Sequence, residues 1–287
     1  MPVRSYLRRV IDFVKETLSL LPFLFATYLV LEAVEARSGG ALGRFLGRAR
    51  SVGPLAGALA GAVPQCGLSA AAASFYAGGV VTIGTLLAVF LSTSDELVPV
   101  LISERVPLSV LAKIISAKIV FALIAGFTID GVISFLRCRR REVSVSELCR
   151  HSHCSCSRRR GIVVPALIHT AEIFVFIVIV SGAVELAMHY FGEECLHELC
   201  LTRPFVGELV AAAVGLVPNC AVSVAGAKLY LAGAMSPGAM MAASFAGSGV
   251  GLLVLFRTNR SFPENMLILL AVYVLGAVFG FLSGFLF

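Results

Sequence analysis

The stretch Val63-Pro64-Gln65-Cys66 decides how this sequence is read, because it recurs as Val217-Pro218-Asn219-Cys220 inside a second segment of similar apolar character. The offset of 154 positions between the two copies holds without a gap for about 65 residues, which is too long for chance spacing. Further matches at this offset are Ser69 with Ser223, Tyr76 with Tyr230, Gly79 with Gly233, Ser94 with Ser248, and Gly126-Phe127 with Gly280-Phe281. The sequence therefore predicts two homologous halves.

The composition around these copies is too hydrophobic for a soluble fold. Of 287 residues, 58% are hydrophobic and only 14% are charged, with a mean hydropathy of +0.93. Runs of about 20 nearly uncharged residues have the length that crosses roughly 30 Å of hydrocarbon. Such stretches fall at residues 18–36, 52–80, 81–103, 107–136, 163–191, 205–233, 237–256 and 265–287. We expect an all-α polytopic membrane protein, which excludes a soluble enzyme, a secreted disulfide scaffold and a disordered chain.

The net charge of +6 is concentrated in one loop. Between Arg137 and Arg160 there are eight arginines against Glu142 and Glu147. Arginines beside a membrane span indicate retention on the cytoplasmic side before they indicate a ligand, so nucleic acid is not an expected partner. The predicted organisation is a first transmembrane repeat with an amphipathic N-terminal helix, a basic linker and a second transmembrane repeat, at residues 1–136, 137–162 and 163–287.

Loop charges predict that the two halves are inverted. The loop at 37–50 carries four arginines and no acid, whereas its counterpart at 191–204 carries three glutamates against Arg203. Equivalent loops then face opposite sides of the membrane, and each half crosses it an odd number of times. Inverted repeats are typical of transporters. Basic residues near the N-terminus oppose the resulting placement of both termini outside, so the side that the termini face stays open.

Proline inside a membrane helix removes an amide donor and frees the carbonyl four residues earlier, here those of Ala60 and Val214. Such breaks persist where protein or a water-lined cavity takes up the backbone, and in duplicated transporters they meet near the midplane. A pair of proline kinks relieved by neighbouring serines is the alternative. The predicted substrate-binding residues are Gln65, Cys66, Ser69, Asp95, Asn219, Cys220, Ser223 and Lys228.

Four of the side chains at or near these breaks suit a metal ion. Thiolates of Cys66 and Cys220 are soft ligands for zinc, copper(I) or trivalent arsenic. Asp95 and Glu96 lie in an apolar stretch, where an ionisable group is a functional candidate. The alternatives are that the cysteines are compact packing residues and that the acids form the first turn of a helix capped by the preceding serines or threonine.

Other polar groups are weaker candidates. Lys228 is predicted either as a counter-ion to Asp95, as an anion ligand, or as an interfacial side chain. Lys113, Lys118 and Asp130 resemble it but rank lower. The basic linker carries enough ligands for an auxiliary zinc or copper site, with an incidental, metal-free linker as the alternative. These ligands are Cys149, His151, His153, Cys154 and Cys156.

Several motifs together resemble a known family. Pro64-Gln65-Cys66-Gly67, the acidic run at 92–96, Pro218-Asn219-Cys220 and the Cys/His-bearing linker look like the ten-span heavy-metal exporters, also described as arsenic-efflux-like permeases or manganese transporters. The likeness covers nearly the whole chain and implies about ten membrane segments if each broken stretch counts as two short helices. The chain departs from exact internal symmetry where Gly249-Val250 replaces the acids Asp95-Glu96.

We therefore expect a secondary active exporter of a heavy metal or metalloid of the manganese, zinc or arsenic class, without enzymatic activity. An inorganic oxyanion or phosphate exporter, a membrane-embedded enzyme and a passive channel are the alternatives. No nucleotide-binding motif is present, so no cofactor is expected. The expected partners are the lipid bilayer and a small inorganic ion, with a homo-oligomer left open, and the expected location is a prokaryotic inner membrane.

Overall fold

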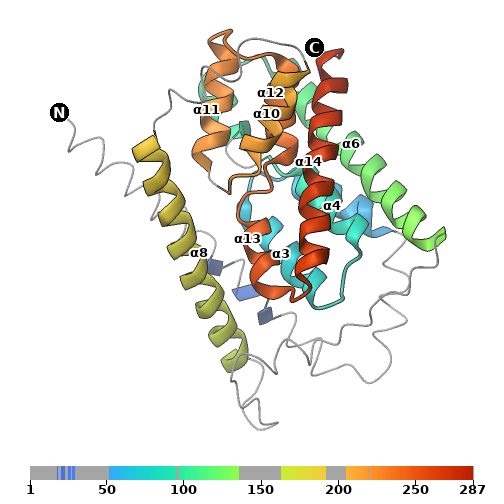
Figure 1. The fold of residues 1–287 in the computed structure, drawn as a ribbon, viewed down its shortest axis with the longest axis vertical. Coiled ribbons are helices and arrows are strands. Elements are labelled where there is room, and N and C mark those ends of the chain that lie inside the picture. Colours follow the sequence, from blue (N-terminus) through green and yellow to red (C-terminus); the bar gives the residue numbers. More distant parts are fainter. Residues whose placement is uncertain are drawn as a thin grey trace.

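The computed structural model describes residues 52–94, 97–135, 163–191, 205–218 and 220–286, together with 18, 21–22, 25–26 and 28–29. All regular secondary structure in these residues is helical (Figure 1). Four stretches are long and apolar enough to cross a membrane: Ile83–Ser103, Leu108–Phe135, Pro237–Thr258 and Phe262–Gly284. The prediction of an all-α polytopic membrane protein is confirmed.

The helix boundaries recur at the offset of 154 that the sequence shows. The helix Val52–Gly61 corresponds to α10 (Val206–Gly215), α3 (Cys66–Ala77) to α11 (Cys220–Leu231), and α4 (Ile83–Ser92) to α12 (Pro237–Ala246). The second half continues with α13 and α14 as the first does with α5 and α6. Their bounds are Leu97–Ser103 for α5, Leu108–Phe135 for α6, Gly251–Thr258 for α13 and Phe262–Gly284 for α14, while α8 spans Val163–Phe191.

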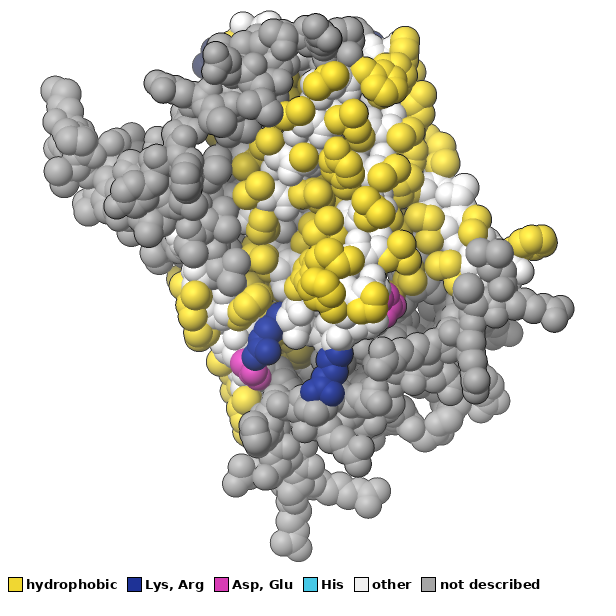
Figure 2. Space-filling model, viewed as in Figure 1, with side chains coloured by type: hydrophobic (Ala, Val, Ile, Leu, Met, Phe, Trp, Pro, Cys, Tyr) yellow, Lys and Arg dark blue, Asp and Glu magenta, His cyan; other side chains and the backbone are white. Residues whose placement is uncertain are grey.

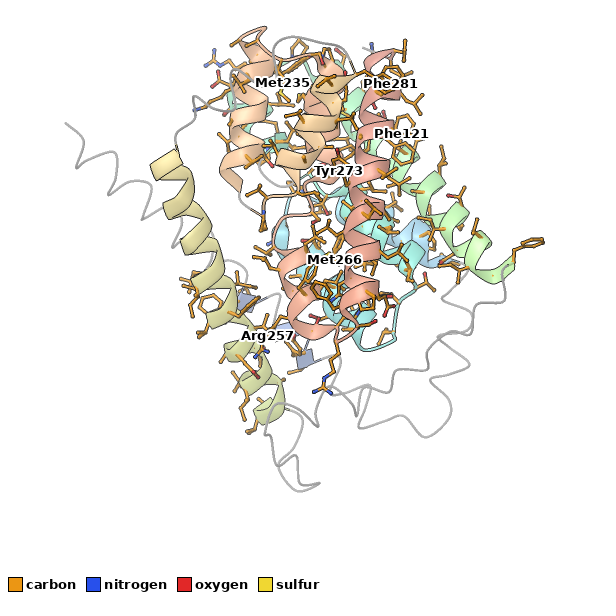
Figure 3. The ribbon with its side chains drawn as sticks, viewed as in Figure 1. Phe121, Met235, Arg257, Met266, Tyr273 and Phe281 are labelled. Atoms are coloured by element: carbon orange, nitrogen blue, oxygen red, sulfur yellow. The ribbon has the colours of Figure 1, made fainter. Side chains whose placement is uncertain are left out.

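Equivalent elements of the two halves point in opposite directions. In Figure 1, α6 runs downward and α14 runs upward. Near the end of α3, the Tyr76 hydroxyl donates a hydrogen bond to Glu264 at the start of α14. Beyond the end of α11, Met235 lies at the other end of the molecule, level with Phe281 near the end of α14 (Figure 3). The ends of α3 and α11 therefore lie at opposite ends of the described structure.

Both proline motifs interrupt helices as expected, but the freed carbonyls find local partners. The Val63 amide donates to Ala60 O at 3.1 Å, and the Val217 amide donates to Val214 O at 3.0 Å. These tight turns follow the helix Val52–Gly61 and α10, and α3 and α11 each begin five residues after the preceding helix ends. The carbonyls of Ala60 and Val214 are therefore satisfied by the turn itself.

Two further interruptions divide apolar stretches, and the sequence offered only the first of them, as the alternative in which Asp95 and Glu96 form the first turn of a helix. The stretch at 81–103 is divided into α4 and α5, and the stretch at 237–256 is divided into α12 and α13. Neither break contains proline. The stretches Ile83–Ser103 and Pro237–Thr258 remain candidate spans by length and hydropathy, but each is divided into two helices.

Glycines allow the helices to approach closely. A Cβ atom added at Gly84 of α4 would lie 2.2 Å from the Gly126 carbonyl of α6, and one at Gly238 of α12 would lie 3.2 Å from the Gly280 carbonyl of α14. Such close contacts hold helices together in lipid. Lipid tails are as apolar as the helix surfaces, so the hydrophobic effect does not drive the helices to associate. Hydrophobic side chains cover much of the visible described surface, and the charged ones gather toward one end (Figure 2).

Gly233 ends the turn after α11 with a φ of 71°, a left-handed conformation shared by Gly79. A Cβ at Gly233 would meet nothing within 4 Å, so Gly233→Ala has only a backbone cost, about 1–2 kcal/mol. Gly226→Ala is the matched control, because that site is equally open but helical, and alanine should stabilise it by up to about 1 kcal/mol. Denaturant unfolding in detergent measures the stability of both variants. Equal stabilities would contradict the left-handed backbone conformation at Gly233.

Candidate functional site

The interrupted ends of four helices pack together in pairs. A Cβ at Gly61, at the end of the helix Val52–Gly61, would lie 2.5 Å from the Val89 carbonyl of α4. A Cβ at Gly215, at the end of α10, would lie 2.3 Å from the Ala243 carbonyl of α12. The helices α4 and α12 also contact each other. The carboxyl ends of these helices therefore meet in one region, which we call the central junction.

Lys118 of α6 supplies a buried positive charge to the central junction. Its side chain is 0% exposed, and its ammonium donates to the Thr93 carbonyl at the end of α4. The same ammonium donates to the Ser244 carbonyl at 2.9 Å and to the Ser244 hydroxyl at 2.6 Å in the last turn of α12. It also lies 5.8 Å from the centre of the Phe245 ring. A cation is favourable there because helix carboxyl ends carry partial negative charge.

Lys118 ranks low among the predicted residues, although comparison of the two halves of the sequence singles it out. Its counterpart at the offset of 154 is Val272, and the counterparts of Asp95 and Glu96 are Gly249 and Val250. The first half thus carries these two acids and this lysine, and the second half has none of the three at the equivalent positions. Residues that appear and disappear together in a duplicated pattern are candidates for one electrostatic unit.

The amino-terminal turns of α3 and α13 meet beside the junction. Ser69 in the first turn of α3 is fully buried, and a Cβ at Gly251 of α13 would lie 2.8 Å from the Ser69 Cβ. The Gln65 side chain makes no capping hydrogen bond to α3, and Val250 makes none to α13. Extensive contact between α3 and α13 brings elements of the two halves together.

Ser248 lies in the break between α12 and α13 and was not predicted as a site residue. Its side chain is 1% exposed, and its hydroxyl has no hydrogen-bond partner among the described residues. The counterpart hydroxyl of Ser94 is equally buried but donates to the Ser92 carbonyl at 3.1 Å. The second half therefore contains a buried hydroxyl that is free to bind another group.

The helices that begin away from the junction have side-chain caps, which accept hydrogen bonds from amides at their amino ends. Thr82 accepts from the Thr85 amide at 3.1 Å, and Asp130 accepts from the Gly84 amide at the same distance, at the start of α4. Ser236 caps α12 in the same way, and Glu208 accepts from the Phe205 amide at 2.7 Å. Asp130 is thus accounted for as a helix cap.

The predicted site residues fall into three groups. Gln65 and Ser69 lie at the start of α3 beside the junction, and Ser223 is half-buried in α11. Cys66 and Cys220 are the first residues of α3 and α11, but their side chains lie outside the described part. Entirely outside the described residues are Asp95, Glu96, Asn219, Cys149, His151, His153, Cys154 and Cys156.

Lys228 is exposed on α11 in this structure, so it is not a buried counter-ion here. The preceding Ala227, by contrast, is fully buried. Successive helix residues diverge by about 100°, so the burial of Ala227 turns Lys228 outward. The interfacial alternative fits this position. Within the described chain no group of three His, Cys, Asp or Glu side chains is placed to hold a metal.

A second charged contact lies away from the junction. Arg257 at the end of α13 donates to Glu172 of α8 at 2.7 Å, and its guanidinium lies 5.9 Å from the centre of the Phe176 ring (Figure 3). Both charged side chains are about half exposed, at 45% and 40%. Exposed pairs of this kind contribute little stability. The contact joins α8 to α13 within the second half without forming a buried site.

Comparison with known proteins assigns the chain to a family. Residues 13–202 match the family described as "Putative, 10TM heavy-metal exporter". This stretch covers more than half of the 287 residues. The chain belongs to this family. No curated protein and no solved structure matches it.

Membership in the heavy-metal exporter family agrees with the resemblance noted in the motifs. It makes the chain a multi-pass integral membrane protein of a transport family. The match includes both the first proline break and Lys118, while the second proline break lies beyond it. In this exporter family member, the chemistry of the central junction must therefore be argued from its own residues.

Proposed function

We propose that this protein is a secondary active exporter of a heavy metal or metalloid, with manganese, zinc and arsenic as the candidate classes. Its two halves, residues 1–136 and 163–287, act as inverted repeats around the central junction, joined by the linker at 137–162. Movement of one set of helices against the other gives alternating access. The opposite directions of α6 and α14 support this arrangement.

One observation carries the proposal: interrupted helices of both halves converge on buried polar groups. Lys118, Ser69 and Ser248 are all at least 99% buried there. Polar groups inside a membrane protein are costly and usually mark a substrate or ion pathway. Broken helices there supply backbone amides and carbonyls that an unbroken helix would use in its own hydrogen bonds. A transport pathway accounts for both features at once.

The substrate-binding residues of this proposal follow from the breaks. Cys66 and Cys220 begin α3 and α11, so each thiol belongs to the first turn after a proline break. Soft thiolates suit zinc or trivalent arsenic, and oxygens of neighbouring side chains keep binding loose enough for release. The remaining proposed ligands are Gln65, Ser69, Asp95, Glu96, Asn219 and Ser223, with the linker cysteines and histidines as an auxiliary metal site.

The same proposal includes no catalysis and no resident cofactor. The protein acts in the lipid bilayer of a prokaryotic inner membrane on a small inorganic ion, without nucleic acid. An oxyanion exporter is the second candidate, because a buried ammonium, that of Lys118, lies within the junction.

Uptake into everted vesicles, which corresponds to export from the cell, tests the thiol site with manganese, zinc, copper, arsenite and phosphate as probes. Cys66→Ser and Cys220→Ser should each reduce export of the transported metal or metalloid at least about tenfold, because serine is a far harder ligand than thiolate. Cys138→Ser, outside the breaks, is the control and should export normally. Normal export by both break variants would refute the thiol site and leave packing as the role of the two cysteines.

A further inference from the structure

The cation-binding groups of the central junction are already occupied by the protein itself. Backbone carbonyls at helix carboxyl ends are the groups that a transported metal ion would use in a broken-helix site. Here the carbonyls of Thr93 and Ser244 accept hydrogen bonds from the Lys118 ammonium. These carbonyls are therefore taken by Lys118 in this structure and are not open to a transported cation.

The remaining polar groups of the backbone are amides, which carry partial positive charge, in contrast to the carbonyls. The first turns of α3 and α13 lie in contact, and neither has a side-chain cap, unlike α4 and α12. The amino end of a helix carries partial positive charge and amide donors directed along its axis. Two such ends beside one another attract an electron-rich group.

Ser248 provides the independent sign of a ligand. Its hydroxyl is buried and has no partner within the described residues, and it immediately precedes Gly249-Val250 and the first turn of α13. A buried hydroxyl without a hydrogen bond is costly and calls for a missing group. Gly251 lacks a Cβ, which would lie 2.8 Å from the Ser69 Cβ, so α13 starts directly against the first turn of α3.

We propose that Ser248 and the adjoining amino-terminal turns of α13 and α3 bind a substrate that presents oxygen atoms, either an oxyanion or a hydroxylated metalloid. The Ser248 hydroxyl donates to one substrate oxygen, and the partial positive charge of the two helix ends stabilises the others. The inference rests on the proposed export function and names the chemical class that the central junction accepts.

Ser248→Ala in the purified full chain tests the site, with Ser94→Ala as the matched control. Arsenite, arsenate and phosphate are the oxygen-bearing probes, and Mn²⁺ and Zn²⁺ are the cation probes. We expect binding and export of at least one oxygen-bearing probe, with its half-saturating concentration raised at least about tenfold in Ser248→Ala. Ser94→Ala should change it less than about threefold, because that hydroxyl is already used by Ser92.

Thermal unfolding without probe separates binding from folding. Removing an unpartnered buried hydroxyl should not lower the unfolding temperature, so weaker binding by Ser248→Ala cannot be attributed to a damaged fold. Wild-type affinity of Ser248→Ala for every oxygen-bearing probe would overturn the site. Export of Mn²⁺ or Zn²⁺ without binding of any oxygen-bearing probe would overturn the substrate class while leaving the export function intact. If no probe is bound or moved, both proposals are wrong.

Discussion

Replacing Lys118 by methionine should abolish export and destabilise the fold. The change removes the ammonium but keeps a long, unbranched side chain, so packing volume changes little. Without it, the Thr93 carbonyl and both Ser244 oxygens lose their buried donor. Leaving a buried polar group unpaired in this way costs about 1–3 kcal/mol for each group. We expect a corresponding loss of unfolding free energy and at least a hundredfold drop in efflux rate.

Lys113→Met is the matched control for this change. Lys113 lies on the same helix, but its side chain is exposed. Its replacement should change the unfolding free energy by less than about 0.5 kcal/mol and leave efflux near wild type. Denaturant unfolding in detergent measures the stability of both variants, and vesicle efflux measures their transport rates. If Lys118→Met exported at the wild-type rate, the ammonium would have no part in transport.

Lys118→Arg separates charge from geometry. Arginine keeps the positive charge, but its planar fork of donors differs from the compact ammonium that reaches two helix ends. The site is fully buried and touches Phe245, so the larger guanidinium also has to displace neighbours. We expect efflux to stay more than about tenfold below wild type. Full rescue by arginine would show that only the net charge matters.

The fold was largely readable from the sequence because its determinants are local. Proline at 64 and 218 ends a helix through its own missing amide, so both breaks appear where the sequence places them. Gly79 and Gly233 adopt the same left-handed turn, because each follows equivalent helices. Length and hydropathy were enough to indicate the membrane spans.

The central junction was only partly readable, because its determinants are distant in sequence. Lys118, 25 residues later in the chain, donates a hydrogen bond to the Thr93 carbonyl at the end of α4, and no local pattern predicts this contact. Lys118 and Lys228 both lie in apolar stretches, yet one is buried and the other exposed. Only the helix packing distinguishes them. The unpartnered state of Ser248 is likewise a property of its surroundings.

Gly280→Ala should strongly destabilise the protein. The added Cβ would lie 2.3 Å from the Ala242 Cβ and 2.5 Å from the Ala242 Cα of α12. Because the obstacle includes backbone, α14 and α12 have to separate, at a cost of about 3 kcal/mol. Gly126→Ala, the equivalent change, should cost less, since its nearest contact is 2.8 Å from the Pro54 Cβ. Gly131→Ala, with nothing within 4 Å, is the control and should be neutral or stabilising.

The effect of Gly280→Ala should extend to transport, because Ala242 lies two residues before Ser244 on α12. Displacing α12 moves the Ser244 oxygens away from Lys118, so efflux should fall even at temperatures where the variant stays folded. Removing the opposing methyl with Ala242→Gly relieves only the Cβ contact, since the Ala242 Cα remains 2.5 Å away, and therefore should rescue stability only in part. Full stability with normal efflux in Gly280→Ala would mean that α12 and α14 separate freely, and the rigid junction on which Lys118 depends would have to be abandoned.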